Sequence, residues 1–133
     1  MTREEKELLL KDLCGRIQYG IIVNIPHVYH NEFKAYIKAI NPEREIVYYK
    51  ICGSSSPLFD RNILGIKPYL RPLSSMTEEE RKEYKKIAPG LVIYDGIRIP
   101  NVQQIDWLNA HHFDYRGLIE KGLALVAPDG MYN

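Results

Sequence analysis

The sequence is poor in the residue patterns that are typical of catalytic and metal sites. It holds only two cysteines, Cys14 and Cys52, which form no CxxC pair and have no histidine at a partnering spacing. We therefore expect small buried thiols rather than a zinc site or a disulfide. The glycines are scattered singly at expected caps and turns, which excludes a phosphate-cradling loop.

The chain also lacks long apolar runs and a strong net charge. No run approaches membrane-spanning length, and the Glu-rich N-terminal segment MTREEKELLLKDLCG has too short an apolar core for a signal peptide. We therefore predict a cytoplasmic protein without membrane contact. The formal net charge of +1 gives no general argument for a polyanionic partner, although residues 13–73 carry eight Lys or Arg against four Asp or Glu.

The composition is typical of one globular domain, which we expect to span residues 1–133. Hydrophobic residues make up 45% of the chain and charged residues 26%, both ordinary values for a folded domain. Ten tyrosines are many for this length. Because Tyr joins an apolar body to a polar tip, these residues suit half-buried strands and binding surfaces alike.

The region from about residue 17 to residue 73 predicts a sheet. Its β-branched, aromatic or alternating segments predict four strands, at residues 19–25, 33–40, 46–51 and 63–73. The turn at residues 41–44 joins the second and third strands into a hairpin, and Pro68 and Pro72 confine the fourth to an edge or cut it short. We predict an α+β fold, with a small, strongly bent antiparallel sheet or an SH3-like barrel and helices packed against it.

Two Thr-x-x-Glu capping boxes predict the first turns of two helices, over residues 3–13 and 78–87. The second helix is nearly all polar, so that only Tyr84 and Ile87 are available to dock it. Apolar runs on either side of Asp95-Gly96 predict a second hairpin.

The C-terminal third begins with the best-specified helix. Asn101 is a good N-cap residue, and Val102, Ile105 and Leu108 follow on one face at helical spacing. Trp107, the single tryptophan, borders this face, and we expect it in the core.

A second helix is expected to start at the cap residue Asp114 and end at Gly122, before a short strand over residues 123–126. This helix–turn–helix–strand order is compatible with a winged helix that binds DNA. A recognition helix normally supplies several base contacts in a positive field, however, and here only Arg116 and Lys121 are available. A structural helix pair is the favoured interpretation.

Two segments resemble a known group of proteins. The runs WLNAHHFDYRGLIEKGLALVAPDGMYN (residues 107–133) and IKPYLRPLSSMTEEER (residues 66–81) resemble small proteins of gut bacteria and their phages or prophages, a group without an assigned function. The resemblance covers most of the chain. It implies a phage-associated or other mobile-element setting and transfers no activity and no site residue.

The histidines do not form a metal site in this interpretation. Side chains of adjacent helical residues point about 100° apart, so His111 and His112 cannot chelate one ion without distortion. His27 and His30 have ligand spacing only on a helix, and Pro26 and its β-branched surroundings argue against one. We predict no catalytic, cofactor-binding or metal-ligating residue, and we expect a protein that is not an enzyme.

One surface remains as a candidate binding site. If the hairpin pairs in an even register, lysines and tyrosines share its polar face, namely Lys34, Tyr36, Lys38, Tyr48 and Lys50. Aromatic planes among cations suit single-stranded nucleic acid, whose bases stack and whose phosphates are neutralised. The favoured alternative is an ordinary solvated sheet face whose lysines protect an edge.

Together these features predict a non-enzymatic accessory or adaptor protein of a mobile element that acts by binding another protein. The alternative is a nucleic-acid-binding module that uses the hairpin face or the C-terminal winged-helix-like unit.

Overall fold

The computed structural model of the chain describes residues 1–26, 32–53, 55, 57–87, 92–94, 97–99 and 102–132. The described part holds three α-helices, α1 (Arg3–Arg16), α2 (Glu78–Ile87) and α3 (Val102–Ala110). Short 3-10 turns η1 (Ile17–Tyr19) and η2 (Leu73–Ser75) follow α1 and β5. The strands are β1 (Ile22–Ile25), β2 (Phe33–Asn41), β3 (Ile46–Ile51), β4 (Phe59–Asn62), β5 (Lys67–Pro72), β6 (Val92–Tyr94), β7 (Ile97–Ile99), β8 (Phe113–Asp114) and β9 (Leu125–Val126).

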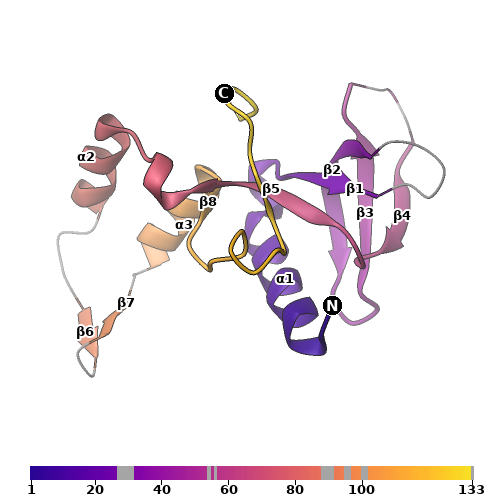
Figure 1. The fold of residues 1–133 in the computed structure, drawn as a ribbon, viewed down its shortest axis with the longest axis horizontal. Helices are drawn as coiled ribbons and strands as arrows, with labels where there is room; N and C mark the ends of the chain where they lie inside the picture. The colour runs from indigo at the N-terminus through magenta and orange to yellow at the C-terminus, as the bar shows by residue number, and fades with distance from the viewer. Residues whose placement is uncertain are drawn as a thin grey trace.

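Seven strands form one sheet in the order β4-β3-β2-β1-β5-β8, and β9 also pairs with β5. All pairs are antiparallel except β5–β8 and β5–β9, which are parallel. The α+β class is therefore confirmed. The SH3-like barrel is wrong, because β5 pairs with β1 over only two residues and then runs on to β8 and β9, so that the sheet does not close (Figure 1).

The expectation that Pro68 and Pro72 confine the fourth strand to an edge or cut it short holds only in its second part, because β5 spans just Lys67–Pro72. Hydrogen bonds leave both edges of β5, since the N–H of Arg71 donates to His112 and the carbonyl of the preceding Leu70 accepts from Ala127. Pro68 is paired with Val23, and next to this pair the hydroxyl of Tyr132 enters the sheet where β1 and β5 diverge. It accepts the N–H of Ile22 at 3.1 Å and donates to the carbonyl of Tyr69 at 2.7 Å. A side chain from the C-terminal segment thus supplies hydrogen bonds that continued strand pairing would otherwise make.

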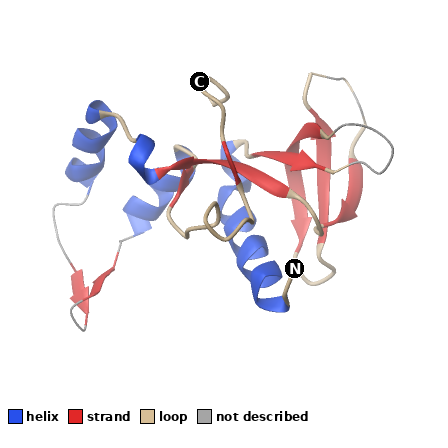
Figure 2. Cartoon of the chain, viewed as in Figure 1, coloured by secondary structure: helices blue, strands red, loops and turns tan. Residues whose placement is uncertain are grey.

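One face of the sheet and helix α1 enclose the larger core, which is mainly aliphatic. Leu9 and Leu13 of α1 are fully buried in one cluster with Val23, Ile37 and Leu70 of the strands. Figure 2 shows α1 beside the strands, with the long strand β5 passing across the molecule toward α2 and α3. The other face of β2 and β3 is left to solvent.

A smaller core lies between α2, α3 and β8, with Trp107 at its centre. The indole is 7% exposed, as expected for a core residue, and its ring lies 5.3 Å from Tyr84, 4.0 Å from His111 and 5.8 Å from Phe113, measured between centroids. The predicted apolar face of α3 is partly wrong. Val102 is 75% exposed, because the helix turns the side that carries Gln104, Trp107 and Leu108 toward α2 and β8.

The predicted C-terminal helix–turn–helix–strand is wrong at its second helix. The carboxylate of Asp114 accepts the N–H groups of Leu118 and Ile119, both at 2.9 Å, four and five residues on, whereas a helix N-cap binds the N–H two or three residues on. Gly117, which lies between Asp114 and Leu118 at φ 73°, has a left-handed conformation that no helix continues, so Asp114 begins a turn. The winged-helix-like unit therefore has no recognition helix.

Other local predictions hold. Thr2 with Glu5 and Thr77 with Glu80 form reciprocal capping boxes, and α1 continues past its predicted end to Arg16. The strands of both hairpins pair antiparallel, and the Asp95-Gly96 turn lies outside the described residues. None of the helices in the described part of the chain is long and apolar enough to cross a bilayer.

Candidate functional site

The structure places the five hairpin residues on one face of the sheet. Tyr36 pairs directly with Lys50, which is the even register, and a bulge after Ile37 sets Tyr48 opposite Ala39. Since Val47 and Tyr49 point into the core, the alternate residues Tyr48 and Lys50 point the other way. Lys34 and Lys38 likewise alternate with buried Ala35 and Ile37 on β2.

On this hairpin face the lysines contact rings. The Nζ of Lys38 lies 5.4 Å from the ring centroid of Tyr36, and that of Lys34 lies 5.6 Å from Tyr69. Tyr36 is 37% exposed. No ion pair joins these lysines to a carboxylate of the described residues, so the face carries available positive charge beside an accessible aromatic ring.

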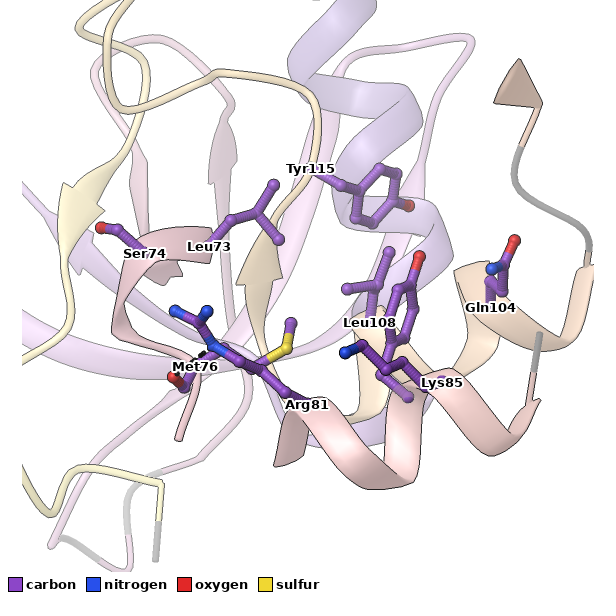
Figure 3. A pocket seen from close by; sticks show the side chains of 9 residues that line it. Leu73, Ser74, Met76, Arg81, Lys85, Gln104, Leu108 and Tyr115 are labelled. Atoms are coloured by element: carbon purple, nitrogen blue, oxygen red, sulfur yellow. Dashed lines mark hydrogen bonds between the residues drawn. The ribbon is translucent and has the colours of Figure 1, made fainter. Parts of the chain in front are cut away.

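A second candidate is a cavity of about 630 Å3 between η2, α2 and α3, here called the α2–α3 groove. Its walls are mostly apolar, with Leu73, Met76, Tyr84, Leu108 and Tyr115. Its polar residues are Ser74, Arg81, Lys85 and Gln104. Figure 3 shows side chains from η2, α2, α3 and the segment after β8 converging on this space.

The position of α2, one wall of the groove, is fixed by the end of β5. Arg71 of β5 donates two hydrogen bonds to the carboxylate of Glu80, at 2.8 and 2.7 Å, and these bonds lower the pKa of Glu80 to about 2. The same carboxylate accepts the N–H of Thr77 in the capping box. Farther along the helix, Tyr84 packs on Trp107. Contacts at both ends therefore hold α2 at a set distance from α3.

The opposite wall is held equally firmly. The hydroxyl of Tyr115 donates to Asn109 at 2.9 Å, and its ring lies between the guanidinium groups of Arg16 and Arg116, at 5.1 and 5.0 Å from the centroid. Both arginines are in turn bound to the buried carboxylate of Asp12. The wall that Tyr115 provides is therefore connected to α1 and the larger core.

The rim of the groove carries two cations. Arg81 and Lys85 are one turn apart on α2 and both are exposed. Arg81 makes one long hydrogen bond, from Nε to the carbonyl of Met76 at 3.4 Å, and neither side chain pairs with a carboxylate in the described part of the chain. None of the described residues that line the groove is an Asp or Glu. The site thus combines apolar walls with unbalanced positive charge.

A polar cleft of about 600 Å3 lies near the His111–His112 turn and the C-terminal segment. His112 is buried at φ 63° and stacks on Tyr132 with 3.6 Å between centroids. Burial lowers the pKa of His112 to about 4, so the imidazole is neutral near pH 7, and burial raises the pKa of Tyr132. These groups serve packing, and Arg71 and Glu80 in the same cleft neutralise each other.

The histidines are not brought together as ligands. His111 stacks on Trp107, and its Nδ1 lies 2.9 Å from the carbonyl oxygen of that residue. Among the residues that the structure describes, no three His, Cys, Asp or Glu side chains are grouped to hold a metal ion. His27 and His30 lie outside the described residues. Both cysteines are free, Cys14 is exposed rather than buried, and partial burial raises the pKa of each thiol.

The α2–α3 groove is absent from the predictions made on the sequence, because four separate segments contribute its lining. The sequence identifies Tyr84 only as a residue that docks α2. The available signal is the spacing of Arg81, Tyr84 and Lys85, which places an aromatic ring and two cations on one helical face.

Comparison with known proteins adds no identity to this geometry. No family model matches the chain, and neither a curated protein nor a solved structure is significantly similar to it.

Proposed function

We propose that this protein is a non-enzymatic accessory or adaptor protein of a mobile element that binds a segment of a partner protein in the α2–α3 groove. The observation that carries the proposal is the groove itself, whose mostly apolar walls include Leu73, 46% exposed on the surface. A volume of about 630 Å3 lies within the range of ligand-binding pockets. The mobile-element setting follows from the resemblance of residues 66–81 and 107–133.

The chemistry of the lining favours binding over catalysis. A nucleophile needs a base within hydrogen-bonding reach, and general acid–base catalysis needs a group that titrates near the working pH. The nine lining residues in the described part of the chain include no His, Cys, Asp or Glu, and Ser74 has no such neighbour among them. The groove can exclude water from an apolar side chain, which is what an anchor residue of a partner requires.

The proposal is tested with a photo-crosslinking amino acid at position 73, in cells of the native host. The matched control carries it at Leu64, an exposed leucine (48% against 46%) at the sheet end of the molecule. We expect one partner to crosslink from position 73 and not from position 64. The same proteins captured from both positions, or none from position 73, would contradict the proposal.

Single-stranded nucleic acid bound by the hairpin face is the second candidate function. It is favoured by the shared face of Lys34, Tyr36, Lys38, Tyr48 and Lys50, and by the exposed ring of Tyr36. Anisotropy titrations with labelled oligonucleotides test it. Binding should weaken steeply with salt, and Tyr36→Ala should cost about 1–3 kcal/mol of binding free energy.

A lysine pair provides the control for this titration. Lys50→Ala should weaken oligonucleotide binding, whereas Lys11→Ala, an exposed change on α1, should not. Weak binding that neither Tyr36→Ala nor Lys50→Ala alters would exclude this candidate and leave the groove.

A further inference from the structure

The basic residues around the groove form two groups, those that pair with a carboxylate and those that do not. Arg71 is bound by Glu80, and Arg16 and Arg116 share the single carboxylate of Asp12, so each of these three arginines is held by a carboxylate inside the fold. Arg81 and Lys85 have no carboxylate partner in the described part of the chain. They are the cations of the groove whose charge is available to a ligand.

We infer that the partner segment bound in the α2–α3 groove is acidic, with an apolar side chain flanked by Asp or Glu carboxylates. The inference rests on the proposed function and specifies the chemistry of its partner. Arg81 and Lys85 lie on the rim, and no Asp or Glu competes for them among the lining residues that the structure describes. A neutral or basic segment would leave both cations unpaired at the interface, whereas an acidic one pairs them.

The spacing of the two cations sets the pattern of the segment. Residues four apart on a helix are separated by about 6 Å along its axis. Two carboxylates at a similar separation, as at positions i and i+4 of a partner helix, match Arg81 and Lys85. Figure 3 shows both side chains beside Met76 and Leu108, so the apolar anchor is expected close to the acids in the partner sequence.

The apolar walls determine how the anchor is held. Tyr84 and Tyr115 line the groove with aromatic side chains, and Leu108 in the lining is almost fully buried. Because Tyr115 and α2 are fixed by the contacts of Asn109 and Arg71, the groove does not have to be ordered when the anchor enters. An aromatic or branched aliphatic residue suits such a space.

A displayed library of random 16-residue peptides tests the inference on the full chain. Peptides are selected on the wild-type protein and counter-selected on Leu73→Glu, so that those kept depend on the groove. We expect the kept peptides to share an apolar residue with two acids within one helical turn. Their affinity should fall at least about tenfold for the double variant Arg81→Glu/Lys85→Glu, and should return when both acids of the peptide are replaced by Lys.

The matched control is Lys82→Glu/Lys86→Glu, which makes the same charge change on the same helix, outside the groove lining. It should alter the affinity by no more than about twofold. Equal losses in the two double variants, or groove-dependent peptides without acids, would overturn the inference while leaving the proposed function standing. A library that yields no peptide dependent on Leu73 would count against the proposed function itself.

Discussion

The two ends of the molecule bury their apolar residues in different ways. At the sheet end, α1 packs on the strands around fully buried aliphatic residues such as Leu13, Val23 and Leu70. At the helical end, only Trp107, Leu108 and Phe113 are buried in the cluster, and α2 has no buried residue. A few large rings therefore hold the helical end together, and side chains that a larger core would cover line the α2–α3 groove instead.

A buried ionic cluster connects the two ends. Asp12 and Arg16 of α1 are fully buried and joined by hydrogen bonds of 2.8 and 3.1 Å, and Arg16 also donates to the carbonyl of Phe113 at 2.7 Å. Arg116 binds the same carboxylate at 3.1 Å. The sheet end thus serves as the support on which β8 and Tyr115 are positioned, and the proposed binding surface lies at the helical end.

The largest effect is expected at the centre of the smaller core. Trp107→Ala removes the ring on which Tyr84, His111 and Phe113 pack and should cost about 3–5 kcal/mol of unfolding free energy, measured by urea denaturation. Val102→Ala in the same helix should change it by less than about 0.5 kcal/mol, because Val102 is exposed. A Trp107→Ala protein as stable as the parent would show that the aromatic cluster does not hold the helical end.

The second largest loss of unfolding free energy is expected when the buried ionic cluster that connects the two ends is broken. Asp12→Asn leaves Arg16 buried without its charge partner and should cost about 3–4 kcal/mol of unfolding free energy. Glu7→Gln makes the same change in the exposed Arg3–Glu7 pair of the same helix, and its unfolding midpoint should stay close to that of the parent. Comparable losses in both variants would argue against a special role for the buried cluster.

Acid should destabilise the protein through His112. Because burial lowers its pKa from 6.5 to about 4, the unfolded chain takes up the proton first as the pH falls. The contribution of the neutral imidazole to the free energy of unfolding is therefore complete above pH 6.5 and is lost as the pH falls toward 4. This loss is on the order of 2–3 kcal/mol.

His112→Asn tests this assignment, because Asn does not titrate and tolerates the φ of 63°. Unfolding free energies of the variant between about pH 7 and pH 5 should vary less than those of the parent. Identical pH dependence in the two proteins would assign the effect to other groups.

The smallest effect is expected for partner binding at the groove. Leu73→Glu should weaken binding of the partner that crosslinks from position 73 about tenfold, or about 1.4 kcal/mol, as measured by calorimetric titration. Folding should be unchanged, because Leu73 is exposed. Leu64→Glu should leave the affinity within about twofold of the parent. Equal losses would place the partner elsewhere.

The sequence predicts best what adjacent residues decide. The capping boxes at Thr2 and Thr77 and the β2–β3 hairpin depend on contacts within a few residues, and the structure confirms them. Local alternation predicts which residues of each strand share a face, but it leaves open the even register of Tyr36 and Lys50 and the bulge after Ile37.

Features that depend on distant residues were mispredicted or missed. The hydroxyl of Tyr132 bridges β1 and β5 next to Pro68, and no local pattern reports that contact. Asp114 is a residue type favoured at helix caps, yet its carboxylate binds the N–H groups of Leu118 and Ile119, beyond the left-handed Gly117. The groove combines residues 73–115 from four segments, so only the fold brings them together.

Hydrogen exchange of the protein with and without its captured partner tests the central claim, that the helical end binds and the sheet end supports it. Exchange of backbone amides slows where a partner covers them or restrains local opening. We predict slower exchange in peptides from residues 73–87 and 102–115, with residues 33–51 unchanged. Slower exchange confined to residues 33–51, the strands of the hairpin face, would contradict the claim.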